Sequence, residues 1–154
     1  LSSVREFKLA IEAIKSFNKP YLIGAHVSEG VKLPSGENIS EIITTINHKS
    51  LLGIILSCVS PENYEKNLNE IKSLGVPFGF KLNGFITTKP TAGYTNTFNK
   101  SKTGNPNEFL GHREDLVPEK MALFVKKFKE AGATILGGCC ETRPSHIKEM
   151  AKLK

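Results

Sequence analysis

The sequence predicts an α/β fold built on a small parallel β-sheet. Four short apolar segments, at residues 21–27, 53–58, 77–83 and 134–138, have the composition of β-strands, and the first is predicted to be buried on both faces. Segments with the apolar spacing of amphipathic helices alternate with them, an order typical of right-handed βαβ units. Four such strands form either a small doubly wound sheet or half of an eight-stranded barrel, which usually needs about 250 residues.

The first three helices are predicted from their starting residues and their apolar spacing. Ser3 and Glu6 form a capping-box pattern at the start of the first helix, which ends before Pro20. Isoleucines at helical spacing indicate a second helix over residues 39–46. Ser60, followed by a proline and a glutamate, is a strong start signal for the third helix.

Two more helices and one long loop are expected in the second half of the chain. Pro118 opens a helix whose apolar residues share one face and which ends at Gly132, and Pro144 opens the last helix. Residues 86–116 form a polar, turn-rich segment without periodicity. Loops of this length are usually functional or disordered.

The composition excludes several classes of protein. The 154 residues suffice for one domain with its own core, and 39% hydrophobic with 23% charged residues indicate a globular chain. The net charge of +6 comes from scattered lysines without the interleaved aromatic residues of a single-strand binder, so we expect no nucleic-acid partner. Without an apolar run of about 20 residues or a signal-peptide pattern, we expect a cytoplasmic protein with no membrane partner.

The three cysteines fall at the predicted ends of two strands. Cys58 ends the second strand, and the adjacent Cys139 and Cys140 end the fourth, after Gly137 and Gly138. Functional sites of parallel α/β folds are built at the carboxyl ends of strands, so the three thiols are expected to converge there. We expect the two glycines to let the backbone turn sharply, so that both sulfurs point inward.

Three thiolates are a suitable ligand set for a catalytic zinc ion, which keeps its fourth position open. An odd number of cysteines with one adjacent pair is a poor disulfide framework. The spacing alone leaves two other interpretations open. One is a structural zinc or interaction domain, which needs a fourth fixed ligand, and the other is a dithiol redox protein, in which Cys58 is only a core residue.

Two motifs around these cysteines resemble those of the zinc-dependent homocysteine S-methyltransferases. GGCCETRPSHI, at residues 137–147, is similar to the family's GGCC-x-T-x-P-x-H-I signature. GIILSCVSPENY, at 53–64, resembles the segment with the family's first cysteine, and FGFKLNGF, at 78–85, resembles the strand with its Pro-Asn pair. The similarity covers nearly the whole chain and is weakest across 86–116.

The resemblance favours half of an eight-stranded barrel over a small doubly wound sheet. The family domain is a (β/α)8 TIM barrel of about 300 residues, and this chain is similar only to its C-terminal half. Residues 1–154 are therefore expected to form about four βα units of one barrel domain, as a fragment or as one half of a split enzyme. The missing N-terminal half is then a partner, and in the family it holds the amino acid group of homocysteine. Ser57, Leu82 and Glu141 replace the usual Asn, Pro and Gly, which leaves the methyl donor open.

The resemblance also implies a reaction. Cys58, Cys139 and Cys140 would bind Zn²⁺, and homocysteine would take the open position as a thiolate, the nucleophilic form of sulfur. That sulfur would attack the methyl group of S-methylmethionine, S-adenosylmethionine, a betaine-like compound or methyltetrahydrofolate, giving methionine. Asn83 is expected beside the zinc, where its amide oxygen is a displaceable fourth ligand; otherwise it forms a turn before Gly84.

Other polar and aromatic residues are weaker candidates. His146, in the first turn of the last helix, is expected to cap that helix or contact a zinc ligand rather than bind the metal. His26 ends the first strand and is a candidate for the mouth of the site, whereas His112 looks like an ordinary loop residue. Tyr94 and Phe98, in the long loop, are candidates for contact with the methyl donor.

Overall fold

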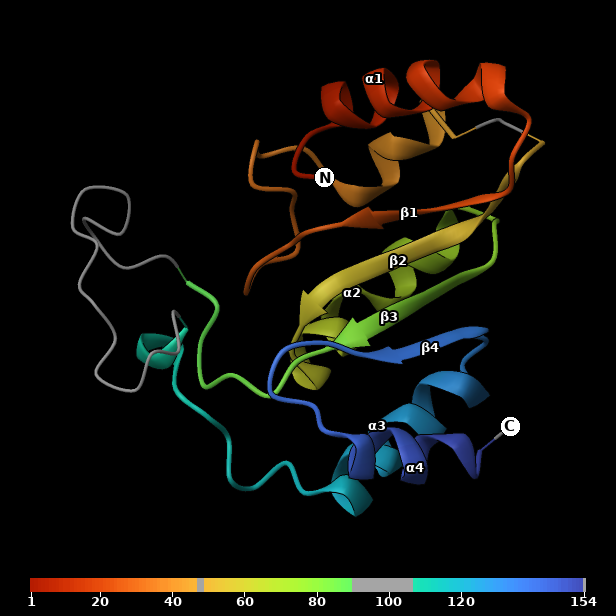
Figure 1. The fold of residues 1–154 in the computed structure, drawn as a ribbon. Coiled ribbons are helices and arrows are strands. Elements are labelled where there is room, and N and C mark those ends of the chain that lie inside the picture. Colours follow the sequence, from red (N-terminus) through yellow and green to blue (C-terminus); the bar gives the residue numbers. More distant parts are fainter. Residues whose placement is uncertain (47–48, 90–106, 154) are drawn as a thin grey trace.

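The computed structural model describes residues 1–46, 49–89 and 107–153 (Figure 1). Helices and parallel strands alternate along these ranges, as predicted. The elements are α1 (Val4–Ile14), η1 (Lys15–Phe17), β1 (Tyr21–Ala25), η2 (Ile39–Thr44), β2 (Leu51–Val59), α2 (Pro61–Ser73), β3 (Phe78–Leu82), η3 (Glu108–Leu110), α3 (Pro118–Glu130), β4 (Ile135–Gly138) and α4 (Pro144–Ala151).

The four strands form one parallel sheet in the order β1-β2-β3-β4. Each strand therefore lies next to the strand that precedes it in the sequence, without the reversal of order that defines a doubly wound sheet. Successive parallel strands joined by helices are the arrangement of a (β/α)8 barrel. The prediction of about four βα units from a barrel is confirmed by this topology and by the comparison with solved structures given below.

The hydrophobic core lies between the sheet and the helices, which Figure 1 shows around and behind the strands. Its centre is an aromatic cluster of Tyr64 from α2, Phe80 from β3 and Phe128 from α3. The ring centroids of Tyr64 lie 4.9 Å from Phe80 and 4.7 Å from Phe128, and the last two are 5.6 Å apart. All three side chains are fully buried, so this cluster fixes α2 and α3 against the middle of the sheet.

The opposite face of the sheet is open in the described chain. Along β3, Phe78, Phe80 and Leu82 are buried, whereas Lys81 between them is exposed. Leu22 of β1 is likewise 47% exposed. The prediction that residues 21–27 form a strand buried on both faces was therefore wrong at Leu22, because only one face of the sheet is covered in the described chain. In a closed barrel this second face is the interior.

One further prediction is modified by the structure. The segment expected to form a helix over 39–46 is instead the 3₁₀ helix η2, capped by Asn38 and Glu41. Its buried isoleucines, Ile39 and Ile42, are three residues apart, which suits a helix of three residues per turn. Of the long loop, residues 90–106 lie outside the described residues. No helix in the described ranges is both long and apolar enough to cross a membrane.

The aromatic cluster gives a prediction about stability. Phe128→Ala should lower the free energy of unfolding by about 3–5 kcal/mol, because it empties a fully buried ring position. Leu123→Ala, on the same helix but 68% exposed, should change it by no more than about 0.5 kcal/mol. Urea unfolding followed by circular dichroism measures both, and equal losses for the two variants would contradict this core assignment.

Candidate metal centre

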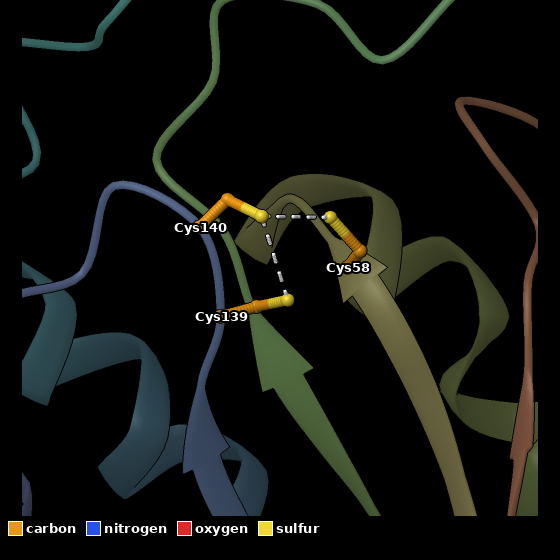
Figure 2. A group of neighbouring side chains, drawn as sticks. All are labelled: Cys58, Cys139 and Cys140. Carbon is orange, nitrogen blue, oxygen red and sulfur yellow. Dashed lines mark hydrogen bonds between the residues drawn. The ribbon is translucent and has the colours of Figure 1, made fainter. Parts of the chain in front are cut away.

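The three cysteine sulfurs converge at the carboxyl ends of β2 and β4 (Figure 2). All three Sγ atoms lie within 4.8 Å of one another, and Cys140 Sγ is 3.9 Å from both Cys58 Sγ and Cys139 Sγ. Each cysteine is a free thiol and is half-buried. The structure therefore brings together the thiols that the sequence places at the ends of two strands.

Cys58 owes its position to a β-bulge. The register between β2 and β3 shifts between Ser57 and Val59, which makes Cys58 the extra residue of its strand. Its φ of 56° lies in the left-handed region, which costs a non-glycine residue roughly 1–2 kcal/mol. Such strain typically marks a functional position, and here it accompanies the approach of the Cys58 thiol to the other two.

The other two cysteines are held by the backbone of the neighbouring strand. Cys139 donates its backbone N–H to the carbonyl of Leu82 at 2.7 Å, and Gly84 donates its own to the carbonyl of Cys140 at 3.0 Å. These bonds continue the pairing of β3 with β4 and hold the chain after β4 beside the end of β3. From there the side chains of Cys139 and Cys140 point toward Cys58 (Figure 2).

The glycines before the pair act differently from the prediction. Neither Gly137 nor Gly138 has a positive φ, and the left-handed residue of this turn is Glu141, with φ 61°. Gly138 is required for space instead, because a Cβ there would lie 2.4 Å from Thr142 Oγ1. The expectation that the two glycines make the sharp turn was therefore wrong. Gly138 instead leaves room for the side chain of Thr142.

The thiols share their protons unequally. The neighbouring Cys58 thiol is the main cause that lowers the pKa of Cys139 to about 5, and the positive charge of Lys81 acts in the same direction. The interaction with Cys139, together with burial, raises the pKa of Cys58. Burial also raises the pKa of Cys140. The cluster thus favours one thiolate at Cys139 at neutral pH, and a metal would displace the remaining protons.

Asn83 lies beside Cys58, at the end of β3. It is fully buried, and its backbone N–H bonds to the carbonyl of Val59 at 2.9 Å. Its side-chain Nδ2 donates to Cys58 Sγ at 3.7 Å, and Oδ1 accepts the backbone N–H of Phe85 at 3.2 Å. In this orientation the amide nitrogen faces the sulfur of Cys58. The side-chain amide would have to rotate before its oxygen could face a metal bound by the cysteines.

The two histidine candidates are engaged with the backbone. His146 is buried; its Nδ1 accepts the backbone N–H of Arg143 at 3.0 Å, and Nε2 lies 2.9 Å from the carbonyl of Leu116. Both ring nitrogens therefore have partners that fix the start of α4. His26 Nδ1 lies 3.4 Å from the carbonyl of Ser57, the residue before Cys58.

Sequence reasoning missed two polar contacts at the edge of the site. His112, expected to be an ordinary loop residue, pairs with Glu141 at 3.1 Å between Nδ1 and Oε2. Arg113 binds both carboxylate oxygens of Glu62 on α2, at 2.7 and 2.9 Å. The only sequence signal for the first contact was Glu141 itself, at a position where glycine is usual. Tyr94 and Phe98 lie outside the described residues.

An open cavity of about 360 Å³ is lined in part by Asn83, the residue whose amide donates to Cys58. Its lining is mainly polar and includes Asn63 and Arg113. Asn63 is buried and donates to the carbonyls of Ser28 and Gly30, while its Oδ1 has no partner in the described structure. The cavity is thus lined by polar groups and shares Asn83 with the surroundings of Cys58.

Comparison with known proteins matches residues 1–153 to the family model described as homocysteine S-methyltransferase. The chain is 30% identical over 140 residues to homocysteine S-methyltransferase 1 of Saccharomyces cerevisiae, covering 87% of the chain and 39% of the relative. It is 27% identical over 130 residues to homocysteine S-methyltransferase 1 of Zea mays, covering 81% of the chain and 35% of the relative. The chain thus spans little more than a third of the length of these relatives.

Among solved structures, the chain resembles the oxidised form of the homocysteine methyltransferase MmuM from Escherichia coli. The TM-score is 0.67 at 16% sequence identity, and the match covers 100% of this chain and 43% of that one. MmuM is a TIM barrel, so the similarity shows that this chain has the fold of less than half of such a barrel.

The contacts of His146 predict that its loss affects stability rather than metal content. His146→Ala should lower the free energy of unfolding by about 1–3 kcal/mol, because it leaves buried backbone groups without partners. Lys148→Ala, an exposed change on the same helix, is the matched control and should have little effect. Chemical denaturation and zinc analysis are measured on both, and a loss of zinc from folded His146→Ala would show that His146 is a ligand.

Proposed function

We propose that this chain, which belongs to the homocysteine S-methyltransferase family, carries the zinc-binding half of an enzyme that methylates the thiol of homocysteine. The single observation that carries the proposal is the convergence of three free thiols at the carboxyl edge of a parallel sheet. The methyl donor is an onium compound, such as S-methylmethionine, S-adenosylmethionine or a betaine-like molecule, or a methylated folate, and the product is methionine.

The residues present fit a zinc ion. Three thiolates satisfy the preference of zinc for sulfur, and the described residues of the cluster include no fourth cysteine, histidine or carboxylate. Their separations are compatible with sulfurs that each lie about 2.3 Å from one ion. When bound, the zinc would supply the positive charge that keeps a substrate thiol deprotonated at neutral pH.

The protein's own residues hold the reacting groups in place. The bulge at Cys58 and the backbone bonds of Cys139 and Cys140 fix the three sulfurs before any ligand arrives. The buried amide of Asn83 reaches Cys58 and lines the adjoining cavity, where it can contact a substrate or act as a displaceable ligand. The cavity can receive the polar part of a methyl donor, which it would position for in-line attack.

Two alternative functions are less well supported. A structural zinc or interaction domain needs a fourth fixed ligand, and the cluster offers three among the described residues. A dithiol redox protein would need only one pair of thiols, which leaves the strained position of Cys58 without a purpose. The family match also favours methyl transfer over both alternatives.

The remaining half of the barrel is the expected partner. The end strands of the sheet, β1 and β4, each have a second edge that no other strand of the described chain covers. At the β1 edge, the Leu1 amino group donates to the carbonyl of Gly24 at 2.7 Å, and His26 donates its backbone N–H to the carbonyl of Leu1 at 2.9 Å. This is the bonding pattern of a parallel strand pair, and it supports continuation of the sheet at that edge.

Two substitutions separate a metal ligand from a displaceable group in the complete enzyme. Cys139→Ser should abolish turnover and greatly weaken zinc binding, because a neutral hydroxyl is a poor zinc ligand. Asn83→Ala should leave zinc largely in place. Zinc content and initial rates are measured on both variants, with circular dichroism as the check on folding. A serine variant with full zinc and near-normal rates would exclude the proposed site.

The chain by itself should have no methyltransferase activity. It spans about 39% of a curated relative and leaves the edges of its sheet open, so the groups that hold homocysteine are not all present. The purified chain is assayed with homocysteine and each candidate donor, with an intact family member as positive control. Turnover at ordinary enzyme rates would mean that residues 1–154 contain the whole active site.

A further inference from the structure

Lys81 is the one charged residue on the face of β3 that turns away from the helices. It alternates with the buried Phe80 and Leu82, so its side chain leaves the opposite side of the sheet. In the register of the sheet it lies between Ser57 of β2 and Gly137 of β4, one residue before Cys58 and two residues before Cys139. Lys81 therefore belongs to the row of residues next to the cysteine cluster.

The neighbouring glycine directs the lysine toward β4. A Cβ on Gly137 would lie 3.8 Å from Lys81 Cγ, so the stem of the lysine passes over the bare backbone there. The two residues that follow Gly138 on this strand are Cys139 and Cys140. The positive charge of Lys81 acts in the direction that favours the thiolate of Cys139.

The charge of Lys81 is not balanced by a carboxylate in the described chain. None of the ion pairs among residues 1–46, 49–89 and 107–153 includes it. The face on which it lies is the interior of the barrel that the family fold predicts. An unpaired ammonium group enclosed in that interior is costly unless an opposite charge lies nearby.

We infer that Lys81 is the counter-charge of the metal centre: its ammonium group compensates the net negative charge of a zinc ion held by three thiolates. The inference rests on the proposed zinc site. Three thiolates and one Zn²⁺ sum to a charge of −1, and a fourth thiolate from substrate makes the sum −2. A fixed cation beside the cluster therefore stabilises the zinc-loaded form, and more strongly after a substrate thiolate binds.

The test compares Lys81→Met, Lys81→Arg and Lys126→Met in the complete protein, because Lys126 is an exposed lysine on the helical side. Competition with a chromophoric chelator gives the zinc affinity of each. Lys81→Met should bind zinc about tenfold or more weakly, because one unit charge near the thiolates is lost. Lys81→Arg should stay within about threefold of the wild type, and Lys126→Met should equal it.

A second measurement separates charge compensation from a purely structural role. The melting temperature of the zinc-free Lys81→Met protein should change far less than its zinc affinity, because without zinc the lysine faces at most the single thiolate of Cys139. The inference would be overturned if Lys81→Met bound zinc as tightly as the wild type. It would also be overturned if the zinc-free variant lost stability as strongly as it lost zinc affinity. Either result would indicate that Lys81 pairs with a carboxylate elsewhere in the barrel. Cys139→Ser tests the site itself: if it keeps its zinc, the proposed function fails, whereas a normal Lys81→Met alone removes only this inference.

Discussion

The site depends on the way two strands that are not neighbours bring their sulfur atoms together across a third. β3 lies between β2 and β4, and strands in a sheet are spaced about 4.8 Å apart, so the ends of β2 and β4 start roughly 10 Å from each other. Two local features remove that separation. The bulge at Cys58 accompanies the approach from one side. On the other side, the backbone bonds from Cys139 to Leu82 and from Gly84 to Cys140 hold the chain after β4 beside β3, and its two thiols point toward Cys58.

The middle strand, β3, places the remaining groups of the site. Asn83 is buried at its end, and the side-chain amide donates to Cys58. Lys81, two residues earlier, lies on the open face of the sheet in register with Gly137 of β4. β3 and its end thus contribute no sulfur, yet they carry a neutral amide and a cation beside the two strands that bear the cysteines. A centre of three thiolates gains from both, since one donates a hydrogen bond and the other supplies positive charge.

Much of the fold could be predicted from the sequence because the signals are local. Start signals such as Ser60 with Pro61, and apolar runs such as 53–58, depend on neighbouring residues alone. The convergence of the cysteines followed from their place at strand ends. The open face could not be predicted in this way, because the exposure of Leu22 and Lys81 depends on which elements of the described chain cover the sheet. The left-handed backbone at Cys58 and Glu141 could not be predicted either, because it goes with the strand register and the turn after β4 rather than with residue type. The contact between His112 and Glu141 joins a loop to a turn 29 residues away in sequence (141 − 112) and left no periodic signal.

The central claim is that three cysteines form a metal site with one exchangeable position. X-ray absorption at the zinc edge, measured on the complete zinc-loaded protein with and without homocysteine, tests it most directly. We predict three sulfur neighbours at about 2.3 Å and one lighter atom without substrate, and four sulfurs after homocysteine is added. Four ligands that do not change on addition of homocysteine, or a first shell without three sulfurs, would contradict the account.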